Sequence, residues 1–187
     1  MHYPLGVMLT CVRWYVAYPL SLRHLEEMMA ERGVSVDHAT VHRWAIKIVP
    51  VLVAVFRRRK RPVGKSWRMD ETYIKVHGQW KYLYRAVDRE GDTIDKSGAN
   101  TAAIESYNAE YCSDIELRQC KYLNNIVEQD NRAIKRIVRP MLGFKVFRCA
   151  RILITGIETM HMIRKGQLDG HDGEVLSAAD QFYSLAF

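Results

Sequence analysis

Three acidic residues occupy positions where a carboxylate points to chemistry. Asp70 lies in the middle of a β-rich stretch, where acidic residues are disfavoured unless a site needs them. Asp95 ends a second β-like segment, and Glu128 lies near the start of a helix predicted from Asn125 to Arg139. Carboxylates that converge from separate elements can hold two divalent cations, which promote phosphodiester exchange when they lie roughly 4 Å apart. Each acid alone is more often a solvated surface residue, and the spacing by itself leaves that alternative open.

Two basic residues follow Glu128 on the same face of its predicted helix. Arg132 and Lys135 come four and seven residues later, so the three side chains share one side of the helix. Basic side chains beside a carboxylate cluster could hold the phosphates of a nucleic-acid backbone.

Residues 1–56 are predicted to form three short helices. Pro19 interrupts the chain, Ser21 can cap the second helix, Gly33 can end it, and Asp37 can cap the third. Two helices joined by a tight turn are typical of a helix-turn-helix, with polar side chains of the second helix facing DNA. The candidate DNA-contacting residues are His38, Thr40, Arg43 and Lys47. The alternative is a three-helix bundle that only packs against the next domain.

The net charge of the 187-residue chain, +7 with a pI of about 9.3, equals that of one short stretch. Residues 57–68 hold seven basic residues and no acidic one, and a polyanion such as DNA could bind them by counterion release. The candidate contacts in this stretch are Arg57, Arg58, Arg59, Lys60 and Arg61. A solvated linker between two domains is the alternative.

Pro50 and this basic stretch are predicted to separate the helices from a segment whose residue pattern is typical of β-strands. Residues 67–76 and 80–87 are predicted to form two antiparallel strands with a turn at His77-Gly78, and a third strand begins at Asp92. From Lys96 onward the pattern is helical. The longest uncharged apolar stretch, residues 48–56, is too short to cross a membrane, which predicts a soluble cytoplasmic protein.

Several motifs along nearly the whole chain resemble bacterial insertion-sequence transposases of the insertion sequence six family, which is of the DDE type. The resemblance is carried by Cys11–Tyr15 (CVRWY), Leu25–Gly33 (LEEMMAERG), Trp67–Val76 (WRMDETYIKV), Tyr82–Asp88 (YLYRAVD), Tyr122–Lys135 (YLNNIVEQDNRAIK) and His161–Gln167 (HMIRKGQ).

The resemblance implies a mixed α/β protein, in which a helix-turn-helix three-helix module precedes a ribonuclease H-like catalytic domain. It implies that Asp70, Asp95 and Glu128 form the triad that binds Mg²⁺, with Mn²⁺ as a substitute, and that Lys135 is the basic residue of the motif. The implied partners are double-stranded DNA, as terminal inverted repeats and target, and further copies of the chain when two ends are held together. The implied location is the bacterial cytoplasm, at the nucleoid.

The catalytic domain looks incomplete. A ribonuclease H-like fold needs a crossover, usually a helix of a dozen or more residues, before the strand with the second aspartate. Here the turn at 88–91 leads directly into Thr93-Ile94-Asp95. Because sequences of the family that it resembles often carry one Thr-Ile-Asp at the third strand and a similar one before the second acid, the resemblance implies an internal deletion that joined the two. The predicted division is a module at 1–56, a linker at 57–66, the catalytic domain at 67–167 and a tail of unknown role at 168–187.

Three functions remain open from the sequence. The first is an active transposase that cuts and joins DNA strands with metal ions. The second is an inactive truncated transposase that only binds DNA. The third, a helix-turn-helix repressor with an unrelated C-terminal domain, conflicts with Asp70, Glu128 and Lys135 in their motif context.

Overall fold

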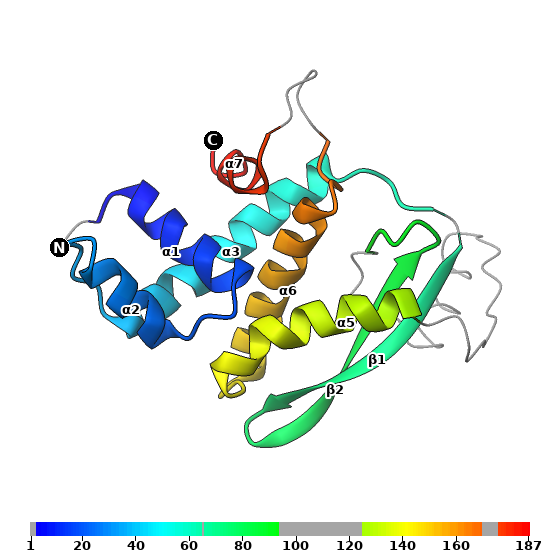
Figure 1. The fold of residues 1–187 in the computed structure, drawn as a ribbon, viewed down its shortest axis with the longest axis horizontal. Coiled ribbons are helices and arrows are strands. Elements are labelled where there is room, and N and C mark those ends of the chain that lie inside the picture. Colours follow the sequence, from blue (N-terminus) through cyan, green and yellow to red (C-terminus); the bar gives the residue numbers. More distant parts are fainter. Residues whose placement is uncertain (1–2, 65, 94–124, 170–175) are drawn as a thin grey trace. The chain divides into compact units, whose positions relative to one another are not determined.

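The computed structural model describes residues 3–64, 66–93, 125–169 and 176–187 (Figure 1). The elements in these ranges are α1 (Leu5–Ala17), α2 (Leu22–Ala30), α3 (His38–Arg59), β1 (Trp67–Val76), β2 (Gln79–Asp88), α5 (Asn125–Val138), a 3-10 turn at Arg139–Met141, α6 (Phe147–Arg164) and α7 (Ala178–Tyr183). N-terminal helices and a two-stranded sheet confirm the mixed α/β class. The ribonuclease H-like arrangement stays a prediction.

The chain divides into two compact units, which we call the helical unit and the hairpin unit. The helical unit comprises Met1–Arg61, Lys75–Gly78 and Ile134–Phe187. The hairpin unit comprises Pro62–Ile74 and Gln79–Ala133. Helix α6, which the sequence assigns to the catalytic domain, therefore lies in the same unit as the N-terminal helices. It buries Leu153, Ile157 and Met160, and it contacts α1, α3 and α7.

The ends of the N-terminal helices follow the predicted capping residues. The Ser21 hydroxyl accepts a hydrogen bond from the backbone N–H of His24, and Asp37 accepts from the backbone N–H groups of Ala39 and Thr40. Gly33 follows α2 with a φ of +72°, a conformation that glycine adopts without strain. The predicted capping roles of Ser21, Gly33 and Asp37 are confirmed.

Helix α3 continues through Pro50 to Arg59, so Pro50 does not separate the N-terminal helices from the rest of the chain. An internal proline costs about 3 kcal/mol because it removes a helix hydrogen bond and crowds the preceding turn. Beyond Pro50, however, α3 buries Leu52, Val53 and Phe56. Each contributes about 1.5–3 kcal/mol, so burial outweighs the break. By length and hydropathy alone α3 could span a membrane, but a core helix passes the same test.

Gly156 of α6 lies where three helices meet. A Cβ atom added there would lie 2.8 Å from Val49 Cγ1 of α3 and 3.2 Å from Val16 Cγ1 of α1. Both neighbours are buried β-branched residues with little freedom to move. The three helices can therefore approach this closely only with glycine at position 156.

We expect Gly156→Ala to lower the free energy of unfolding by about 1–2 kcal/mol, the overpacking cost less the gain from removing a helical glycine. Thermal denaturation followed by circular dichroism measures it. Gly6→Ala in α1 is the matched control, because nothing lies within 4 Å of its added Cβ and the change should be neutral or stabilising. Equal melting temperatures for the wild type and Gly156→Ala would contradict this packing.

The hairpin of β1 and β2 turns at the predicted residues, His77 and Gly78, which both have positive φ. Such a two-residue turn fits the right-handed twist of paired strands. After β2, Asp88 Oδ1 accepts hydrogen bonds from the backbone N–H groups of Glu90 and Asp92. Of the predicted third strand, the described part shows a single antiparallel bridge between Thr93 and Val87.

Candidate metal centre and DNA-contacting residues

Asp70 is held by a side chain of α5. The amide Nδ2 of Asn131 donates a hydrogen bond to Asp70 Oδ2 over 2.8 Å, and Asn131 is only 4% exposed. Asp70 itself is partly buried in β1. Asp70 is a predicted site residue, whereas Asn131 is not among those predicted. The available signal was its position one helical turn after Glu128.

Glu128 lies on the same side of α5 as Asn131. Residues three apart in a helix share a face, so the turn of α5 that contacts Asp70 also carries Glu128. The Glu128 side chain is half exposed, and its Oε2 lies 4.0 Å from Nη2 of Arg132. The hydrogen bond from Asn131 therefore joins Asp70 of β1 to the turn of α5 that also carries Glu128. The predicted Lys135 is exposed on the next turn, and Asp95 lies outside the described residues.

A buried ion pair fixes α5 against β2. Nη2 of Arg85 lies 2.6 Å from Oδ2 of Asp130, and the two side chains are 1% and 4% exposed. The Thr93 hydroxyl donates to the same Asp130 oxygen over 3.2 Å. Helix α5 is thus tied to β1 through Asn131 and to β2 through Asp130. Neither Arg85 nor Asp130 stands out in the sequence as a residue with a structural role.

The residues around Asp70 fit a divalent cation. Carboxylate and amide oxygens are the ligands that Mg²⁺ and Mn²⁺ prefer. Within the described ranges, the buried Oδ1 of Asn131 and the buried hydroxyl of Thr72 have no hydrogen-bond partner. Thr72 lies two residues beyond Asp70 on the same face of β1. Buried polar atoms without partners are uncommon, and an ion or ion-bound water would satisfy them.

Three of the four predicted DNA-contacting residues of α3 share one face. Thr40, Arg43 and Lys47 lie at helical spacing, Arg43 and Lys47 are exposed, and Nη2 of Arg43 donates to the Thr40 hydroxyl. His38 differs, because its Nδ1 lies 3.0 Å from Glu26 Oε2 of α2 and 3.0 Å from Asp37 Oδ1. This contact links the two helices of the predicted helix-turn-helix.

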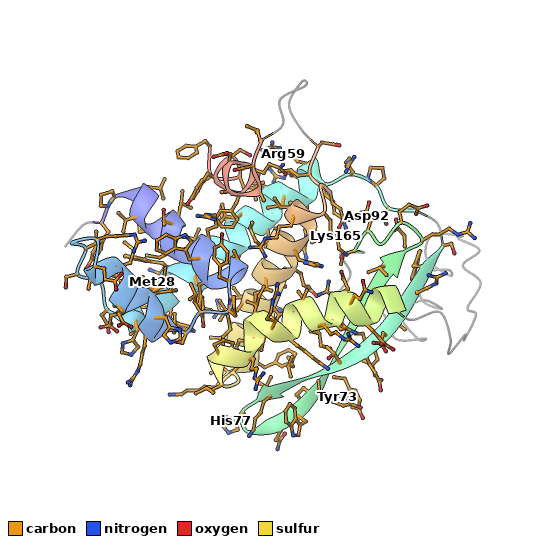
Figure 2. All side chains as sticks on the ribbon, in the orientation of Figure 1. Met28, Arg59, Tyr73, His77, Asp92 and Lys165 are labelled. Atoms are coloured by element: carbon orange, nitrogen blue, oxygen red, sulfur yellow. The ribbon has the colours of Figure 1, made fainter. Side chains whose placement is uncertain are left out.

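Part of the basic stretch contacts the C-terminal chain. Arg57, Arg58 and Arg59 form the last turn of α3 and are not linker. The backbone of Lys60 forms an isolated antiparallel β-bridge with that of Leu168. Nη1 of Arg59 (Figure 2) donates a hydrogen bond to the Ser184 carbonyl.

Arg61 donates to the Gly166 carbonyl, directly after α6. The carbonyl groups at a helix C-terminus attract cations, which explains why this basic chain lies against the end of α6.

The sequence of this chain is similar to a known domain family and to several known proteins. It matches the DDE domain family of IS240-type transposases over residues 64–99 and 93–167. It is 34% identical to the transposase for insertion sequence-like element IS431mec of Staphylococcus aureus strain Mu50, over 192 aligned positions covering 85% of this chain and 84% of the relative. The transposase for insertion sequence element IS257 in transposon Tn4003 of S. aureus is 33% identical with the same coverage.

An uncharacterized protein of Yersinia pseudotuberculosis, pYV0051, is 40% identical over 97 residues, which are 46% of this chain and 82% of that protein. No solved structure is detectably similar. The matched domain is that of a DDE transposase, a class that uses divalent metal ions and acts on DNA. Within that class, the chain belongs to the insertion sequence six family.

The internal deletion stays a prediction, and two features of the comparisons concern the same region. The chain matches the family in two segments rather than one, and these segments overlap at residues 93–99. The alignment with the IS431mec transposase is longer than the whole 187-residue chain, although it covers only 85% of it. It therefore includes positions of the relative that this chain lacks.

Proposed function

We propose that this protein binds the terminal inverted repeats of its insertion sequence and catalyses metal-dependent cleavage and transfer of DNA strands. Its partners are the repeat and target duplexes, and further copies of the chain hold two ends together. Its metal is Mg²⁺, with Mn²⁺ as a substitute, and its place is the bacterial cytoplasm at the nucleoid. The proposed ligands are Asp70, Asp95 and Glu128.

The observation that carries this proposal is the hydrogen bond from Asn131 to Asp70. It connects the strand that bears the first acid to the helix turn that bears the last, 58 residues later in the chain. This contact supports a site in which the carboxylates of Asp70 and Glu128, far apart in the sequence, converge on a metal ion.

The chain's own residues have distinct parts in this function. Asn131 orients the Asp70 carboxylate, and the Arg85–Asp130 pair sets the position of α5. Arg132 and Lys135, exposed on α5, bind the phosphates beside the scissile bond. When bound, divalent cations activate the attacking oxygen and stabilise the leaving oxygen.

The second candidate function is an inactive transposase that retains only DNA binding. The overlap of the family matches at residues 93–99 favours it, because one segment cannot serve as both the third strand and the strand with the second acid. Both candidates require repeat binding, and only the first requires metal-dependent joining of DNA strands. Binding must therefore be measured separately from strand transfer.

The part of the proposal that concerns repeat binding is tested by Arg43→Ala and Lys47→Ala on the exposed face of α3. Loss of a side chain that reads a base typically costs about 1–3 kcal/mol, so we expect each variant to bind repeat DNA about 5- to 150-fold more weakly. Fluorescence anisotropy with a labelled repeat duplex measures it. Lys81→Ala, which removes an exposed cation from the hairpin, should change affinity less than twofold. Equal losses in all three variants would contradict recognition by α3.

A further inference from the structure

The connection between α5 and α6 combines two properties that rarely occur together on a surface. Leu142, Val146 and Phe147 are 90%, 53% and 62% exposed. Around them, residues 132–157 contain seven basic residues and no acidic one, a stretch hidden in the sequence analysis because acidic residues elsewhere balance its charge. Within this stretch, the exposed cations that belong to the helical unit are Lys135, Arg136, Arg139, Lys145, Arg148 and Arg151.

The backbone of this connection is anchored, so its apolar side chains are displayed in a fixed position. The Phe144 N–H donates to the Lys75 carbonyl over 2.8 Å, and the Phe144 carbonyl accepts from the N–H of His77 (labelled in Figure 2) over 2.7 Å. Phe144 itself is buried. Gly143 has a φ of +93°, and a Cβ there would lie 3.1 Å from the Lys75 carbonyl oxygen.

Leu142 adopts a conformation that its own side chain disfavours. Its φ of 56° is left-handed, a strained conformation for a bulky residue that occurs at functional sites more than elsewhere. The side chain offsets none of that strain through burial, because it is 90% exposed. Glycine or asparagine would fit the backbone better. The fold therefore holds an apolar side chain outward at the expense of stability.

We infer that the α5–α6 connection is a wedge for distorted DNA: Leu142 and Phe147 insert at an unstacked base step, and Arg139, Lys145 and Arg148 bind the flanking phosphates. Apolar wedges between cations are how proteins hold kinked or unpaired duplexes. A second copy fits the surface poorly, because a symmetric contact through the apolar residues would bring the two sets of cations together. The inference rests on the proposed action on DNA and adds the form of DNA bound.

The test uses the full chain and two labelled duplexes of equal length and unrelated to the repeat, one fully paired and one with two unpaired bases at its centre. Base stacking on a protein side chain is worth about 1–3 kcal/mol, so we expect the wild type to bind the distorted duplex about tenfold or more tightly than the paired one. The double variant Leu142→Gly with Phe147→Ser should lose this preference and still bind the paired duplex within about twofold of the wild-type affinity.

Folding and charge are controlled separately. Leu142→Gly alone should melt at the same or a higher temperature than the wild type, which a purely structural role for Leu142 would not allow. Phe187 is as exposed as Leu142 but lies 40 residues or more beyond the α5–α6 connection in the sequence. The Phe187→Ser variant should therefore keep the preference for distorted DNA. Lys145→Gln should weaken binding to both duplexes alike and reduce the salt dependence by about one counterion.

No preference of the wild type for the distorted duplex, or an unchanged preference in the double variant, would overturn the wedge. A shift from dimer to monomer in the double variant, seen by sedimentation with DNA binding unchanged, would overturn it in favour of a contact between copies. Failure of the proposed function gives a different pattern. In that case the wild type would still prefer distorted DNA, while it would neither bind the inverted repeats nor join strands.

Discussion

Replacing Asp130 by asparagine should lower the free energy of unfolding by about 3–5 kcal/mol, because the change leaves the buried Arg85 guanidinium without its carboxylate. Both side chains are almost fully buried, and the pair is 2.6 Å apart. A loss of this size is a large part of the 5–15 kcal/mol that typically separates a folded domain from its unfolded chain. Urea denaturation of the full chain, followed by circular dichroism, measures it.

Two further variants show whether the effect belongs to the ion pair. The double variant Arg85→Met with Asp130→Leu removes both charges and keeps apolar volume, so it should recover most of the lost stability. Gln129→Ala, at the exposed neighbouring position of α5, should change the denaturation midpoint little. A double variant as unstable as Asp130→Asn would mean that the pair does not hold α5 in the way described.

Replacing Asp70 by asparagine should abolish most binding of divalent cations, because it removes one of the converging carboxylates. Titration of the protein with Mn²⁺, followed by electron paramagnetic resonance of the free ion, measures the affinity without any DNA. Asn131→Leu should weaken Mn²⁺ binding by about 10–100-fold, the usual effect of removing a group that orients a ligand. Asp70→Asn should cost more than that.

Glu71→Gln is the matched control for this titration. Glu71 is the next residue of β1, it is exposed, and its side chain lies on the opposite face of the strand. The substitution removes the same charge as Asp70→Asn, so a general electrostatic effect would appear in both variants. Equal Mn²⁺ affinities in Asp70→Asn and Glu71→Gln would place the metal elsewhere.

Local signals predicted the ends of most elements. Ser21, Asp37 and Gly33 act through hydrogen bonds and φ preferences within a few residues, and these are readable from the sequence. Pro50 misled the prediction because its local cost is outweighed by burial of the following turns of α3 against other helices. The close packing at Gly156 was also out of reach, since it depends on residues more than 100 positions away.

The candidate site also combines residues that local sequence signals predict with residues whose role depends on distant contacts. Asp70 and Glu128 were found by their unusual local positions and by their motifs, while Asn131 and the Arg85–Asp130 pair emerge only when α5 is placed against the hairpin. The second basic stretch was present in the sequence but concealed by a whole-chain charge balance. A charge profile along the chain reveals this second stretch, at residues 132–157. The structure then distinguishes its exposed cations from basic residues that contact the C-terminal chain, such as Arg59 and Arg61.

Whether this chain is an active transposase is decided by strand transfer on a plasmid that carries two inverted repeats, with Mg²⁺ and a target plasmid. The proposed function predicts joined products that disappear with a chelator and fall at least about 100-fold in Glu128→Gln, while that variant binds repeat DNA normally. Normal repeat binding without joined products in Mg²⁺ or Mn²⁺, combined with transfer by a variant in which the predicted deletion after Thr93 is filled, would contradict it. The chain would then be a DNA-binding remnant of a transposase.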